Sequence, residues 1–243
     1  MQRREFITLV GAATFAWSRV ARAQQSLPVV GFLNGAAPGL YTKFLGEFRR
    51  GLNEMGFVEG HNVVVEYRWA ENHYERLPEL AAELVRRQVT VIAATSTPSA
   101  LAAKATNTKI PIVFTTASDP VALGWVASLA RPAGNMTGAT QLNMELGPKR
   151  FELMRQLLPD ATSIALVVNP NNPRVAEVQT RDAQVAARSL GLQLQILQAS
   201  TPAEFDKIAA GLSKRSVGLV IAGGDSFFFS ESAALAEIGR AHV

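Results

Sequence analysis

The sequence has 243 residues, of which 48% are hydrophobic, 18% are charged and none is cysteine. This length allows one large core or two modest ones. Without cysteine, these residues cannot form a disulfide, a thiolate metal site or a lipid-modified cysteine. The isoelectric point of about 9.7 resembles that of nucleic-acid-binding proteins. However, three of the four net positive charges fall within residues 1–23, so the remainder does not predict a nucleic-acid partner.

The first 23 residues predict an export signal. Arg3 and Arg4 precede an apolar stretch from Phe6 to Trp17, and Ala21-Arg22-Ala23 follows it. This pattern is typical of a signal that is cleaved after Ala23. The stretch has about 12 residues where a membrane-spanning helix needs ~20, so we expect no membrane anchor. Paired arginines fit the twin-arginine route and the general secretory route alike. We expect a mature protein in the periplasm that is not embedded in a membrane.

Beyond Leu27, short apolar runs rich in β-branched residues alternate with segments of helical period. This alternation predicts βα units arranged around parallel sheets. The expected strands are 28–33, 63–67, 90–94, 112–115, 137–142, 164–168, 192–197 and 217–222. The expected helices are 40–55, 75–87, 99–106, 149–158, 173–190 and 202–212. In the first helix, the spacing of Phe44, Phe48, Leu52 and Met55 predicts one buried stripe, and Gly56 should end the helix.

The alternation is interrupted around residues 134–148, where several glycines and a proline cluster. We interpret this segment as a crossing between two Rossmann-like α/β lobes, the first formed by residues 28–141 and the second by residues 142–243. A further helix beginning near Ser230 reaches the last residue without a following strand. We therefore expect the second lobe to be truncated and the closing residues to be non-native.

Catalytic and cofactor motifs are absent from the sequence. The turn from Gly31 to Gly39 lacks the three-glycine fingerprint of dinucleotide-binding proteins and the lysine of a P-loop. The Gly224-Asp225-Ser226 block resembles that of some esterases, but it lies late in the chain and no histidine has a convincing acidic partner. The three histidines, at 61, 73 and 242, lack metal-ligand spacing. We expect no enzyme activity, no metal and no cofactor.

Polar residues follow several of the predicted strands. Open α/β sheets bind ligands at the carboxyl ends of their strands, which makes these residues candidates for ligand binding. They are Asn34, Ser96, Thr97 and Thr116 in the first lobe, and Asn169 and Asp225 in the second. Each could instead cap the next helix. Two hydroxyl-rich turns on one sheet edge favour binding of a carboxylate or another polar group. Phe227, Phe228 and Phe229 fit core packing better than a pocket wall.

Several segments together resemble the ABC transporter substrate-binding proteins related to tryptophan and aromatic amino-acid binding proteins. The resemblance covers nearly the whole chain after the signal. The segments that carry it are Gly56-Phe57-Val58-Glu59-Gly60-His61-Asn62-Val63, Thr97-Pro98-Ser99, Ile110-Pro111-Ile112-Val113-Phe114, Asp119-Pro120-Val121 and Arg131-Pro132-Ala133-Gly134-Asn135-Met136-Thr137-Gly138. The resemblance implies a type I periplasmic binding fold whose lobes close on a small solute and deliver it to an inner-membrane ABC permease.

The resemblance leaves the solute open, although it favours an amino-acid-like molecule. The chain has Gly223-Gly224-Asp225-Ser226 where relatives commonly have proline-containing turns, so the solute of a relative does not carry over. The same space between the lobes could also bind the ligand of a periplasmic sensor that reports to a membrane receptor. Fold alone does not decide between transport and sensing. The related fold of sugar-responsive repressors is disfavoured, because an export signal occupies the place of a DNA-binding helix pair.

Overall fold

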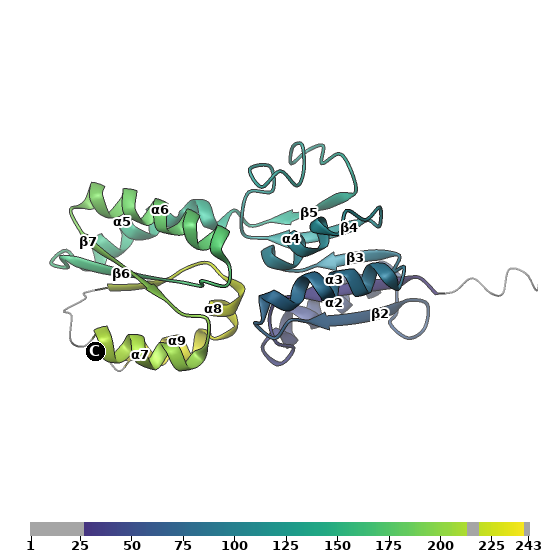
Figure 1. Ribbon diagram of the computed structural model, residues 1–243, viewed down its shortest axis with the longest axis horizontal. Helices are drawn as coiled ribbons and strands as arrows, with labels where there is room; N and C mark the ends of the chain where they lie inside the picture. The colour runs from purple at the N-terminus through teal and green to yellow at the C-terminus, as the bar shows by residue number, and fades with distance from the viewer. Residues whose placement is uncertain (1–26, 213–218, 241–243) are drawn as a thin grey trace, which may run out of the picture.

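The computed structural model describes residues 27–212 and 219–240, and it forms two α/β lobes (Figure 1). All strand pairs are parallel within these residues. The first sheet has the order β2-β1-β3-β4-β5 and consists of β1 (Val29–Asn34), β2 (Val64–Trp69), β3 (Val91–Ala94), β4 (Ile112–Thr116) and β5 (Met136–Thr140). The second has the order β7-β6-β8 and consists of β6 (Ser163–Val168), β7 (Gln193–Gln198) and β8 (Leu219–Ala222). The predicted α/β fold with parallel sheets is confirmed.

Helices connect the strands, as the alternating sequence pattern predicts. They are α2 (Thr42–Glu54), α3 (Leu77–Arg86), α4 (Thr97–Ala105), α5 (Gly147–Leu157), α6 (Pro173–Leu190), α7 (Pro202–Leu212), α8 (Ser226–Ser230) and α9 (Ser232–Arg240). Three short 3-10 helices are η1 (Gly39–Tyr41), η2 (Tyr74–Arg76) and η3 (Asn143–Leu146). The predicted signal, its cleavage site and residues 241–243 lie outside the described residues. The boundary after residue 141 stays a prediction; it falls between β5 and η3.

The sheet of the first lobe is buried on both faces around β1 and β3, in agreement with their largely apolar sequences. On one face, Leu77, Leu84 and Ile92 belong to a cluster that involves α3 and α4. On the other face, Phe32 and Val65 belong to a cluster against which α2 packs. The strands are therefore fixed between two helical layers, and their carboxyl ends are free to carry a site.

The predicted buried stripe of α2 is partly wrong. Met55 is 77% exposed and Phe44 is 41% exposed. The side chains that pack against the sheet are Tyr41, Leu45, Phe48 and Leu52. The predicted and the observed stripe have Phe48 and Leu52 in common. The Phe48 ring packs against that of Phe32 in β1, with 5.1 Å between the ring centroids. The predicted helix end is confirmed: Gly56 has φ +82° and donates to the carbonyl of Asn53.

The observed packing of α2 predicts which of its side chains contribute to the free energy of unfolding. Phe48→Ala should lower the free energy of unfolding by about 2 kcal/mol, because it removes a half-buried ring that packs on Phe32. Met55→Ala should change it by less than about 0.5 kcal/mol, because that side chain is exposed. Urea denaturation of the two variants measures the difference. A larger loss of unfolding free energy in Met55→Ala than in Phe48→Ala would show that Met55 is buried, as the sequence predicts.

In the second lobe, α5 and α6 lie on one side of the sheet, and α7 and α9 lie on the other (Figure 1). Phe205, Phe227 and Phe228 are buried, and they belong to the same cluster as Leu77 and Ile92 of the first lobe. The core interpretation of Phe227 and Phe228 is thus confirmed, whereas Phe229 is 59% exposed. Helix α8 faces the first lobe, so the residues around it connect the two lobes.

None of the helices in the described part of the chain is both long and apolar enough to cross a membrane.

Candidate ligand-binding site between the lobes

Three predicted residues lie at one edge of the first sheet. Asn34 ends β1, Thr97 begins the helix after β3, and Thr116 ends β4. Because β1 pairs with β3 and β3 pairs with β4, all in parallel, these carboxyl ends are neighbours. This is the edge at which open α/β sheets bind ligands.

Asn34 is fully buried, and its amide bonds both within its own turn and to the turn that follows β3. Its Oδ1 accepts a hydrogen bond from the backbone N–H of Ala36 (2.7 Å), and its Nδ2 donates to Oγ1 of Thr95 (2.7 Å). The hydroxyl of Tyr41 donates to the carbonyl of Thr95 (3.0 Å). The amide therefore shapes the turn, as an Asx-type side chain does, and its contact with a ligand stays a prediction.

The other first-lobe candidates form a cluster of buried hydroxyls. Ser96 caps α4, since its Oγ accepts from the backbone N–H of Ser99 (3.3 Å). The Oγ1 atoms of Thr97 and Thr116 lie 2.8 Å apart in one hydrogen bond. The structure thus brings together the two hydroxyl-rich turns. Capping and ligand binding remain compatible here, because a hydroxyl can donate and accept at once.

In the second lobe, Asp225 lies between β8 and α8 and joins two asparagines. Its Oδ1 accepts from Nδ2 of Asn169 (2.9 Å) and from the backbone N–H of Phe227 (3.0 Å). Its Oδ2 accepts from Nδ2 of Asn172 (2.8 Å). The structure therefore brings the predicted Asn169 and Asp225 together. Asn172 was not predicted, although it lies three residues after Asn169 in the same turn.

Tyr74 connects the two groups of turns across the lobes, and no sequence pattern marks it. Its hydroxyl donates to Oδ1 of Asp225 (2.9 Å) and accepts from the backbone N–H of Phe227 (3.1 Å). Its ring lies against Gly35: a Cβ there would stand 2.9 Å from Cε1 of Tyr74 and 3.4 Å from Oγ of Ser96. Burial, with a smaller contribution from Asp225, raises the pKa of the Tyr74 hydroxyl well above its usual value, so it stays a donor.

An aromatic surface lies beside these polar groups. The rings of Phe44 in α2 and Phe229 in α8 are 5.4 Å apart and cross between the lobes. Tyr41 lies 5.1 Å from Phe44 and 5.8 Å from Trp69. Phe44 and Phe229 are both exposed in part. Small-molecule sites combine such apolar walls with a few placed polar groups.

The structure contains a cavity in each lobe. One of about 360 Å³ is lined by Lys104, Trp125 and Asn135, among others, and by the first residues of β4 and β5. It therefore belongs to the opposite edge of the first sheet, where no ligand residue was predicted. A second cavity, of about 30 Å³, lies in the second lobe behind Gly223 and Gly224. Residues 27–212 and 219–240 contain no group of three or more histidine or acidic side chains that could hold a metal.

A sequence model described as "ABC transporter substrate binding protein" matches residues 10–236 of the chain. Among curated proteins, a "Tyrosine-binding protein" of Clostridioides difficile (strain R20291) is 34% identical over 123 residues, which cover 50% of this chain and 35% of that protein. The matched region thus spans about a third of the length of this relative.

Two solved structures resemble the chain over most of its length. A conserved domain protein from Vibrio cholerae has a TM-score of 0.73 and 24% identity, and the match covers 90% of this chain and 72% of that one. An ABC domain from Streptococcus pneumoniae in complex with L-Trp has a TM-score of 0.71 and 18% identity, covering 89% and 72%. At these identities the likeness establishes the fold.

Proposed function

The chain belongs to the ABC transporter substrate-binding protein family, and we propose that it captures an amino-acid-like solute between its lobes. The likeness to solved structures confirms the predicted type I periplasmic binding fold. In the proposed function, the protein is exported to the periplasm, binds the solute without transforming it, and delivers it to an inner-membrane ABC permease. Ser96, Thr97, Thr116, Asn169 and Asp225 contribute to the binding site.

The observation that carries this proposal is the junction of polar turns from both lobes at Tyr74 and Asp225. Three donors converge on Oδ1 of Asp225, whereas Oδ2 accepts from Asn172 alone among the described residues. Each carboxylate oxygen has about two lone-pair sites. Those of Oδ1 are occupied, with the N–H of Phe227 shared between Oδ1 and the Tyr74 hydroxyl, whereas Oδ2 retains the capacity to accept from an ammonium group. The hydroxyls of Thr97 and Thr116, at the start of α4 and the end of β4, suit a carboxylate. Together these groups suit a zwitterion.

The aromatic surface supports an aromatic side chain on the solute. Phe44 and Phe229 present partly exposed rings beside the polar groups, and their edge-to-face contact is an arrangement that aromatic rings prefer. The names of the relatives agree with this choice, since one is called tyrosine-binding and another was solved with L-Trp. We therefore propose L-tyrosine or L-tryptophan as the first solutes to test.

The experiment is a thermal-shift and calorimetric comparison of L-tyrosine, L-tryptophan, tyramine, and 3-(4-hydroxyphenyl)propionate. Tyramine lacks the carboxylate of tyrosine, and the propionate lacks its ammonium group. At 100 times its dissociation constant, a solute should stabilise the protein by about 2.7 kcal/mol. We expect this effect from at least one of the two amino acids and from neither truncated analogue. Equal binding of tyramine would contradict the proposed role of the hydroxyl turns.

A further inference from the structure

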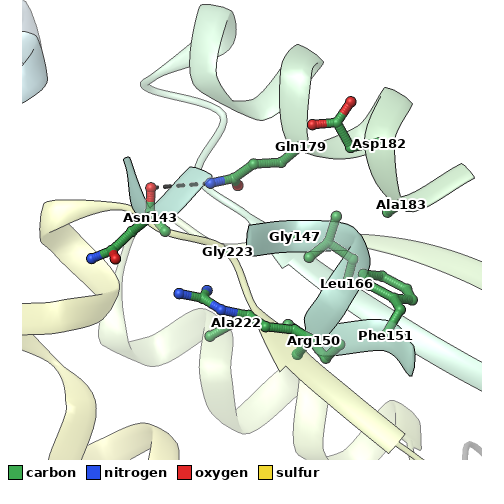
Figure 2. Close-up of a pocket in the computed structure, with 12 residues that line it drawn as sticks. Asn143, Gly147, Arg150, Phe151, Leu166, Gln179, Asp182, Ala183, Ala222 and Gly223 are labelled. Carbon is green, nitrogen blue, oxygen red and sulfur yellow. Dashed lines mark hydrogen bonds between the residues drawn. The ribbon is translucent and has the colours of Figure 1, made fainter. Parts of the chain in front are cut away.

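The small cavity of the second lobe lies directly behind the turn that carries Asp225. It is bounded by α5, α6 and the end of β8, and its lining includes Arg150, Gln179, Gly223 and Gly224 (Figure 2). Nε2 of Gln179 donates to the carbonyl of Gly224 (3.0 Å) and so holds the turn against α6. A Cβ on Gly223 would come within 3.0 Å of the carbonyl oxygen of Val167. It would also lie 2.2 Å from Oε1 of Gln179, so a side chain at this position would displace Gln179 from the cavity wall.

Arg150 is the cationic group of this cavity, and it is half-buried. Several other arginines pair with carboxylates: Arg68 contacts Glu66 and Glu83, and Arg49 contacts Glu59. Arg150 has no ion pair or hydrogen bond to any residue in the described part of the chain. Removing a charge from water without a partner costs free energy. The position of Arg150 in the cavity wall thus favours an anionic group beside it.

The shape and surroundings of the cavity narrow the class of anion. Its volume of about 30 Å³ is roughly twice the minimum of about 10–15 Å³ that a cavity needs to hold one water molecule, which suits one small group and not a whole solute. A guanidinium presents a planar fork that matches a carboxylate. Gly147, the first residue of α5, also lines the cavity, and helix N-termini favour anions. Asp182 on α6 is the opposing charge, and its carboxylate is directed away from the guanidinium (Figure 2).

We propose that this cavity is a subsite for a single carboxylate group, which Arg150 binds. The carboxylate could come from a free small acid, or from a second acid group of the solute proposed above, whose binding site includes Asp225, the residue after Gly224. The subsite does not depend on the identity of the solute that the crevice binds. Arg150 would thus supply a cationic group next to the site between the lobes, whose predicted residues include no cation.

The first arm of the test is an NMR titration with sodium acetate, with sodium chloride at the same ionic strength as the reference. Acetate should produce saturable shifts of the Arg150 Nε–H signal and of the backbone amides of Gly223 and Gly224. Arg150→Gln should abolish the amide shifts, and Arg150→Lys should weaken them while keeping the charge. Lys149→Gln removes a charge from the same helix, where Lys149 pairs with Glu152 at the surface, and should leave the shifts unchanged.

The second arm distinguishes the sources by comparing L-glutamate with L-glutamine, its neutral isostere. If a solute supplies the carboxylate, the wild-type protein should bind glutamate about tenfold more tightly, and Arg150→Gln should remove this preference. If a free acid supplies it, acetate should saturate Arg150 while the two amino acids bind alike. The proposal is overturned if acetate shifts grow linearly and match those of chloride, or if Arg150→Gln leaves the Gly223 and Gly224 shifts intact.

Discussion

Replacing Asp225 with alanine should lower the free energy of unfolding by about 3 kcal/mol. The carboxylate accepts from Tyr74, Asn169, Asn172 and the backbone of Phe227, so its loss leaves buried donors without a partner. Each such donor costs roughly 1–3 kcal/mol, and the N-cap of α8 is lost as well. Urea denaturation monitored by circular dichroism measures the change.

Two further variants separate the network from general effects of the substitution. Asp206→Ala removes an exposed carboxylate from α7 and should change the free energy of unfolding by less than about 0.5 kcal/mol. Tyr74→Phe deletes only the hydroxyl between the lobes and should cost about 1 kcal/mol. If Asp225→Ala destabilises no more than Asp206→Ala, the network does not connect the lobes as described.

Replacing Gly138 with alanine should destabilise the protein by about 3 kcal/mol. A Cβ at this position of β5 would lie 2.0 Å from the carbonyl oxygen of Phe114 and 2.8 Å from its carbonyl carbon. These are backbone atoms of the neighbouring strand β4, so no side-chain rotation relieves the overlap. Strand β5 would have to move away from β4, at a cost typical of severe overpacking. Chemical denaturation gives the size of the loss.

The matched control is Gly51→Ala in α2. A Cβ there would meet nothing within 4 Å, and alanine is a better helix former than glycine by roughly 0.5–1 kcal/mol. This variant should be slightly more stable than the wild type. If both glycine variants behaved alike, the close approach of β5 to β4 would not be a feature of the protein in solution.

Much of the fold could be predicted from the sequence because local patterns determine it. Most predicted strands are runs of apolar residues that overlap a strand of the structure, and 173–190 and 202–212 match α6 and α7. The stripe of α2 was partly wrong because the helical period of Phe44, Phe48, Leu52 and Met55 does not reveal which side meets the sheet. Helix α8 was missed because it is five residues long and starts at a cap, Asp225.

In the candidate site, too, local patterns predict some residues, and tertiary packing determines the others. Thr97, Thr116 and Asp225 follow strands, so the position of each could be inferred from the general rule for parallel sheets. Tyr74 could not, since it bonds to a residue 151 positions away and depends on how the lobes pack. Arg150 could not either, because an unpaired arginine is visible only once its neighbours are known. That the strand-end residues bind a ligand remains our proposal.

The central claim is that the solute binds where the turns of the two lobes meet. The most direct measurement is hydrogen exchange with and without the tightest-binding amino acid of the panel. We expect new protection in residues 95–99, 116–119, 169–172 and 223–227, the turns that carry the hydroxyl groups and Asp225. Protection confined to the larger cavity at the opposite sheet edge, around Lys104, Trp125 and Asn135, would contradict it.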